Sequence, residues 1–164
     1  MFRRALIATV FSFSLIGAAS AATMNFEASL TGKAEVPANA ATGTGELLAT
    51  LDTVSKTLTY TLTFQGLTGP AGAAHFHGPA AAGANGGVAV AIGKDLVSPV
   101  TGKATLTDAQ IKDLTAGMWY VNVHTDANKG GELRGQVTHK NEGYGGPAKK
   151  AAAAAPAATA PMKH

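Results

Sequence analysis

Short segments of alternating apolar and polar residues follow one another along most of this chain of 164 residues. The clearest covers residues 56–64, in which Leu58, Tyr60, Leu62 and Phe64 alternate with threonines. Because side chains two apart on an extended strand point to the same face, this pattern predicts a half-buried antiparallel strand. Similar alternation predicts strands at residues 25–31, 46–51, 73–77, 88–92, 103–106, 118–125 and 132–139.

Turn-forming residues separate these segments, and one helical turn is predicted among them. Thr107 is a suitable N-cap for a helix that begins at Asp108, turns Ile111 and Leu114 inward and ends at Gly117. Seven or eight short strands with one helical turn predict an all-β fold, most simply a Greek-key β-sandwich. An up-and-down barrel stays open as the alternative, because the pattern does not give the order of the strands in space.

Neither end of the chain has the pattern of the folded part. Residues 1–21 combine a basic start, an apolar run over residues 5–17 and the small-residue site Ala19-Ser20-Ala21, which is typical of a cleaved signal peptide. The apolar run is shorter than the roughly 20 residues that a membrane-spanning helix needs. We therefore expect a periplasmic or secreted protein without stable membrane insertion, a domain over residues 22–140, and a disordered Ala/Pro/Lys tail over residues 141–164.

Charge and cysteine content narrow the function classes. Between residues 22 and 140 there are eight Lys/Arg and nine Asp/Glu, so the domain is nearly neutral and nothing in it favours nucleic acid as a partner. The chain has no cysteine, which excludes disulfides, thiol catalysis, zinc ribbons and iron–sulfur clusters. A metal would have to be held by histidine, carboxylate, methionine or backbone groups.

Three of the five histidines fall in two of the predicted strands. His75 and His77 share one face of their strand, with Phe76 on the core side, and His124 lies opposite the core-facing valines of residues 118–125. Outward histidines from two strands predict a metal site, with copper first because divalent ions follow an affinity order that favours Cu(II). Zinc is the second choice, since three histidines with an open position also suit catalytic zinc. The competing interpretation is that these are half-exposed histidines bonded to neighbouring loops.

Several ordered motifs resemble one known family, the CHRD (chordin-type) domain. The motifs are residues 30–37 (LTGKAEVP), 43–45 (GTG), 58–62 (LTYTL), 75–80 (HFHGPA), 117–125 (GMWYVNVHT) and 130–137 (GGELRGQV). The resemblance covers residues 24–138 and implies a β-sandwich of an exported protein. It does not by itself imply an activity, so a metal-free structural or adhesion-type interaction module remains the alternative to a metal-binding protein.

A second resemblance concerns the chemistry of the histidines. The order of His-x-His, a later strand that ends in His, a Gly-rich loop and an Arg is similar to the copper/zinc superoxide dismutase pattern. This resemblance implies that His75, His77 and His124 are copper ligands and that Arg134 guides superoxide as a catalytic residue. The chain departs from the pattern in lacking the disulfide, the zinc loop and a fourth copper-ligand histidine, so it resembles a copper-only form. The alternative role for Arg134 is an ion pair with Glu132 or Asp126.

Overall fold

Nine antiparallel strands form one sheet in the computed structural model, which describes residues 23–140. The expected signal peptide and tail lie outside the described residues. The elements are β1 (Thr23–Thr31), the 3-10 turn η1 (Gly32–Ala34), β2 (Thr44–Asp52), β3 (Thr57–Gln65), β4 (Ala71–His77), β5 (Val88–Leu96), β6 (Val100–Thr105), α1 (Asp108–Thr115), β7 (Tyr120–His124), β8 (Leu133–Gln136) and β9 (Thr138–His139).

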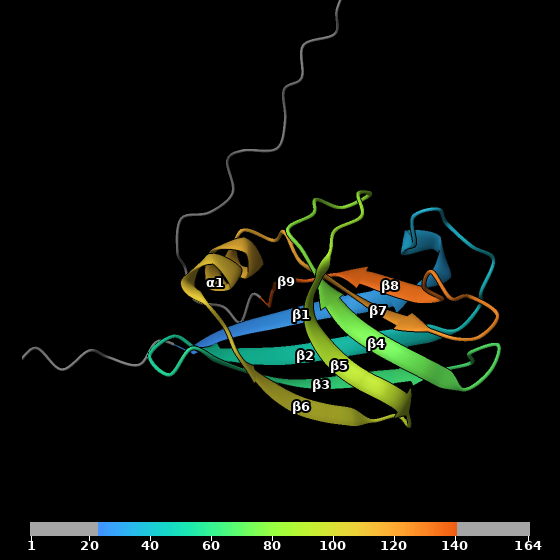
Figure 1. Ribbon diagram of the computed structural model, residues 1–164, viewed down its shortest axis with the longest axis horizontal. Coiled ribbons are helices and arrows are strands. Elements are labelled where there is room, and N and C mark those ends of the chain that lie inside the picture. Colours follow the sequence, from blue (N-terminus) through green and yellow to red (C-terminus); the bar gives the residue numbers. More distant parts are fainter. Residues whose placement is uncertain (1–22, 141–164) are drawn as a thin grey trace, which may run out of the picture.

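The sheet is nearly closed around one core. Its strand order is β5-β4-β7-β8-β1-β2-β3-β6, with β9 paired to β1 beside this path. Figure 1 shows β4 and β5 crossing in front of β2 and β3, so the sheet makes two layers. Buried side chains of both layers pack together, among them Leu47 and Leu62 from one and Phe76 and Val121 from the other. The all-β prediction is therefore confirmed.

The connections have Greek-key character. β4, β5 and β6 follow one another along the chain, and β7 then returns to pair with β4. The alternative of an up-and-down barrel is wrong, because β3 pairs with β6 instead of with its successor β4.

The predicted elements occur in place, but several differ in extent, among them β6, which begins at Val100 instead of 103. Residues 132–139 do not form one strand, because the chain changes partners at Val137 and continues as the separate strand β9 against β1. The strand predicted at 88–92 continues to Leu96. The helix is as predicted: the Thr107 side chain accepts from the Gln110 N–H, Leu114 is buried, and Gly117 takes a φ of 71°.

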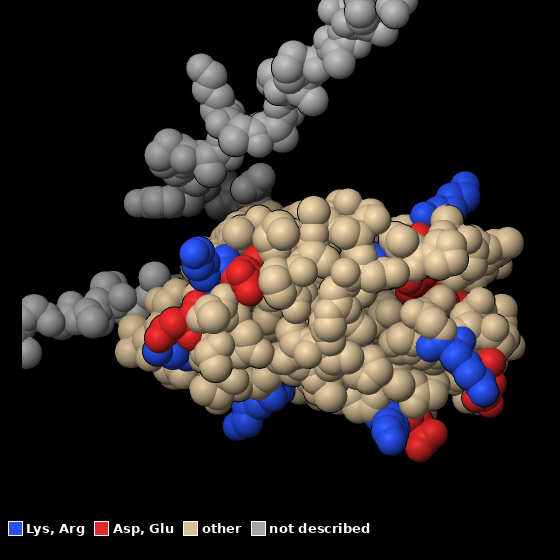
Figure 2. All heavy atoms as spheres, turned by 45° about the horizontal axis from the view of Figure 1, so that its top comes forward, with Lys and Arg blue, Asp and Glu red and all other residues tan. Residues whose placement is uncertain are grey.

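The surface carries charges of both signs. On the face shown in Figure 2, Lys and Arg side chains alternate with Asp and Glu side chains around a largely uncharged centre. Among the described residues, no helix has the length and hydrophobicity needed to span a membrane.

Candidate metal centre

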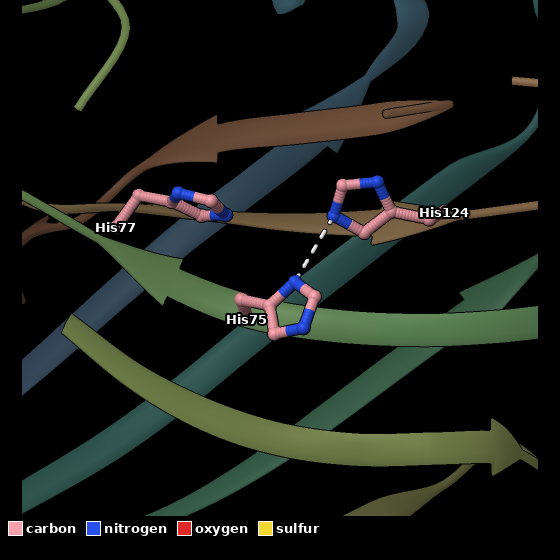
Figure 3. A group of neighbouring side chains, drawn as sticks. All are labelled: His75, His77 and His124. Carbon is pink, nitrogen blue, oxygen red and sulfur yellow. Dashed lines mark hydrogen bonds between the residues drawn. The ribbon is translucent and has the colours of Figure 1, made fainter. Parts of the chain in front are cut away.

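The pairing of β4 with β7 brings the three histidines together on the outer side of the sheet. His75 lies opposite Asn122 and His77 lies opposite Tyr120 in the register of these strands, and His124 is two residues beyond Asn122. On the inner side Phe76 is fully buried in the core. The strand parity expected from the sequence is thus correct, and Figure 3 shows the three rings gathered above β4 and β7.

The ring nitrogens are close enough to share one ion. One nitrogen from each histidine lies within 4.8 Å of the others, and His75 Nδ1 is 3.1 Å from His124 Nε2. Two nitrogen ligands at about 2.0–2.1 Å from one ion lie roughly 3–4 Å apart. Small side-chain rotations therefore suffice to give His75, His77 and His124 a common ion. The residues present fit a metal.

Backbone carbonyls fix the tautomers of two of these rings. His77 Nδ1 lies 3.1 Å from the carbonyl oxygen of Gly86, and His124 Nδ1 lies 3.0 Å from that of Lys129. A carbonyl only accepts hydrogen bonds, so Nδ1 carries the proton in both rings and Nε2 carries the lone pair. This arrangement, with the second ring nitrogen bonded to a carbonyl, is typical of histidines that bind metals.

The Nε2 lone pairs of His77 and His124 have few hydrogen-bond donors near them. His77 Nε2 is buried and makes no hydrogen bond of normal length among residues 23–140, although the Asn122 side chain is close enough to raise the pKa of His77. His124 Nε2 faces His75 Nδ1, and since the His124 proton is on its other nitrogen, His75 must donate in that contact. A buried acceptor without a donor is costly, and a bound cation would satisfy it.

Burial favours the neutral form of His75 and of His77. Burial lowers the pKa of His75, and the neighbouring His124 and His77 lower it further. Burial also lowers the pKa of His77, although the hydrogen bond to the Gly86 carbonyl acts in the opposite direction. Neutral imidazole is the form that binds metals, so both shifts favour a ligand over a surface cation.

Arg134 does not form the ion pair considered for it. Its side chain is only 2% exposed, and its two amino groups donate to Ala84 O at 2.6 Å and Asn85 Oδ1 at 2.9 Å. Its guanidinium carbon lies 3.5 Å from the centre of the Tyr120 ring. The expectation of a pair with Glu132 or Asp126 is therefore wrong, because β8 turns this side chain toward the loop after β4.

The Glu132 carboxylate is bound by neutral hydrogen-bond donors instead of by Arg134. It is fully buried, and its carboxylate accepts from Thr68 N–H at 2.7 Å, from the Thr68 and Thr125 hydroxyls and from Asn128 Nδ2 at 3.0 Å. Burial raises the pKa of Glu132, but these hydrogen bonds outweigh it and hold the pKa below 4.5. The carboxylate thereby fastens the loop that presents the Lys129 carbonyl to His124.

Sequence reasoning missed the groups that support the histidines. The Gly86 and Lys129 carbonyls belong to the backbone, so no residue type signals them. Tyr120 shares the outward face of His124, and an aromatic residue on that face is a signal that could have been used. Its ring stacks on His77 with centroids 4.8 Å apart and planes inclined by 3°. His139, in β9, faces Phe26 of β1 and lies outside the cluster.

Comparison with known proteins identifies the domain. The model of one family, described as the CHRD domain, matches residues 26–137. This stretch contains the three clustered histidines and Arg134. No curated protein matches the chain, and no solved structure matches it.

Proposed function

The chain belongs to the CHRD domain family, and we propose that it is an exported copper-binding protein whose ion is held by His75, His77 and His124. The observation that carries the proposal is the pair of carbonyl contacts that leaves Nε2 of His77 and His124 unprotonated and directed into the cluster. A surface histidine with a purely structural role has no need of a buried, unpartnered lone pair.

Copper is the preferred ion for chemical reasons. Imidazole nitrogen suits copper, zinc and nickel, and the affinity of such sites for divalent ions is greatest for Cu(II). Three neutral imidazoles also accommodate both Cu(II) and Cu(I), which suits a protein that stores or buffers copper outside the cytoplasm. Zinc remains the second choice.

Superoxide dismutation stays a prediction from the resemblance. This activity would also require that superoxide, a small anion, reaches the copper ion and that Arg134 attracts the anion. The domain is nearly neutral between residues 22 and 140, so long-range attraction of an anion would be weak. Copper binding is therefore the more economical proposal and does not depend on turnover.

The test is copper binding by the mature, untagged protein against a competing chelator, with metal analysis after dialysis. We expect one copper ion per domain in the wild type and loss of that ion when His75→Ala and His124→Ala are combined. His139→Ala is the matched control, because it removes a histidine outside the cluster and should retain the ion. A bound ion also raises the free energy of unfolding, by about 2.7 kcal/mol at a free concentration 100 times Kd.

Two results would count against the proposal. Equal copper stoichiometry and affinity in the wild type and the double variant would remove the three histidines from the site. A wild type that takes up neither copper nor zinc would favour the metal-free interaction module.

A further inference from the structure

The loop that supports His77 has two internal backbone hydrogen bonds, from Gly78 N–H to Gly87 O and from Ala84 N–H to Ala81 O, each at 3.0 Å. Residues 78–87, between β4 and β5, comprise four glycines, four alanines, one proline and Asn85. Glycine-rich backbone has high conformational freedom, and alanine offers little surface to pack. Yet this loop must place the Gly86 carbonyl 3.1 Å from His77 Nδ1. Contacts from outside the loop have to supply the remaining order. Near its start Ala80 N–H donates to Met118 O and Ala80 O accepts from Gln136 Nε2, which leaves the part next to Gly86 to other residues.

Arg134 supplies the first of these contacts. One amino group donates to the Ala84 carbonyl at 2.6 Å and the other to Asn85 Oδ1 at 2.9 Å. Asn85 Nδ2 in turn donates to the Val36 carbonyl at 2.9 Å, which ties the loop to the segment after η1. A planar guanidinium donates hydrogen bonds to two neighbouring acceptors in a fixed geometry, which the single ammonium group of lysine does not do.

Tyr120 links the same guanidinium to the histidine. β7 lies between β4 and β8, and Tyr120 is paired with His77 on one side and Gln136 on the other. Its ring is stacked on His77 and carries the Arg134 guanidinium 3.5 Å from its centre. Its hydroxyl lies 3.3 Å from the Gly86 nitrogen and 3.4 Å from the Gly86 oxygen. Loop and ring thus converge on one histidine.

We propose that Arg134 is a positioning residue for His77: it fixes the 78–87 loop and the Tyr120 ring, and these two fix the tautomer and the ring plane of His77. This inference rests on the proposed copper site but goes beyond it, because it assigns to Arg134 a role that needs no anion. An arginine that guides an anion must present its guanidinium to solvent, whereas Arg134 is 2% exposed and each of its amino groups already donates one hydrogen bond to the loop.

The two roles differ in what Arg134→Lys does. Lysine keeps the positive charge, so attraction of an anion is largely retained, but it loses the two-acceptor grip and the flat stacking surface. For a positioning residue we expect copper affinity to fall at least about tenfold, as is usual when the outer support of a ligand is removed, with a changed Cu(II) EPR spectrum. Asn85→Ala should shift the spectrum in the same direction, although Arg134 and its charge remain.

Lys33→Ala is the matched control for charge. Lys33 and Arg134 line the same surface pocket, which has a volume of 310 Å³, but Lys33 does not bond the loop. We expect Lys33→Ala to leave copper affinity and the EPR spectrum unchanged. If Lys33→Ala reproduces the effect of Arg134→Lys, the effect comes from any change in the pocket that these two residues line, and the positioning role is overturned.

A second measurement needs no metal. Long-range ¹H–¹⁵N NMR of the metal-free protein reports which ring nitrogen of His77 carries the proton. We expect the Nδ1–H form in the wild type and in Lys33→Ala, and a mixture of both tautomers in Arg134→Lys and Asn85→Ala. If Arg134→Lys does not fold, as judged by circular dichroism, the exposed Asn85→Ala variant decides alone.

The outcomes separate the two proposals. A wild type that binds no metal removes the proposed function, while the NMR result still tests whether Arg134 positions His77. A wild type that binds copper, together with unchanged His77 tautomer and EPR spectrum in Arg134→Lys and Asn85→Ala, overturns the positioning role and leaves the copper site standing.

Discussion

Two loops flank the histidine cluster. Each presents a backbone carbonyl to one histidine, but the buried residues that hold the two loops have opposite charges. The 78–87 loop gives its Gly86 carbonyl to His77, and the 125–131 loop gives its Lys129 carbonyl to His124. The first loop is held by the cation of Arg134 and the second by the carboxylate of Glu132. These two charged residues are two positions apart and almost completely buried, yet each bonds a different loop instead of the other.

The difference lies in how each buried charge is compensated. Glu132 receives hydrogen bonds from an N–H, two hydroxyls and an amide, so its localised charge is surrounded by donors. Arg134 has a delocalised, weakly hydrated charge that tolerates an aromatic face and two acceptors. An isolated buried carboxylate is costly without such donors. The comparison predicts that the hydrogen bonds of Glu132 contribute mainly to the free energy of unfolding. Those of Arg134 contribute mainly to the geometry of the metal site.

The largest expected effect is that of Glu132→Ala. It leaves the hydroxyls of Thr68 and Thr125 and the Asn128 amide without their acceptor, and we expect the free energy of unfolding to fall by about 3 kcal/mol. Urea unfolding of the metal-free protein measures it. The control Glu46→Ala removes an exposed carboxylate and should stay within about 0.5 kcal/mol of wild type. A loss in Glu132→Ala no larger than that of the control would remove the contrast between the two loops.

The sequence predicts the strands and the histidine cluster because both depend on local periodicity. Alternation in residues 73–77 and 118–125 is enough to turn His75, His77 and His124 outward, and the shared face follows once the two strands pair. The strand order could not be predicted, because pairing of β3 with β6 joins segments that are far apart in the chain.

The partners of Glu132 and Arg134 show where periodicity stops being informative. Equal parity and opposite charge favour an ion pair between them, and this expectation is wrong. Their real partners, Thr68 and Asn128 for one and Ala84 and Asn85 for the other, lie in loops. The path of a loop depends on tertiary contacts, so an alternating pattern does not encode it.

An intermediate effect is expected from pH. The folded-state pKa of Glu132 lies below its ordinary 4.5, so the ionised carboxylate stabilises the fold above pH 4.5 and this contribution is lost as pH falls through the lowered pKa. We expect the wild type to lose more stability than Glu132→Gln between pH 5 and pH 2.5. Urea midpoints across this range measure the difference.

The other titrating groups cancel in that comparison. His75 and His77 have lowered pKa values, so they also favour unfolding as pH falls, but mainly below 6.5 and equally in both proteins. Glu35 has a raised pKa, chiefly through burial, and acts in the opposite sense, again in both proteins. Parallel curves for wild type and Glu132→Gln below pH 4.5 would mean that the carboxylate does not hold its loop through its charge.

The smallest expected effect is that of Lys129→Ala, and it tests whether the second loop acts only through its backbone. His124 contacts the Lys129 carbonyl, while the Lys129 side chain is exposed. An exposed charge is largely screened at physiological salt, so we expect copper affinity to change by less than about twofold in a chelator competition.

Gly131→Ala is the contrasting variant in the same loop. Gly131 has a φ of 136°, and an added Cβ would overlap the Glu35 carboxylate, so the loop must move. We expect this variant to weaken copper binding, whereas an equal loss in Lys129→Ala would show that the side chain, and not the loop path, governs His124.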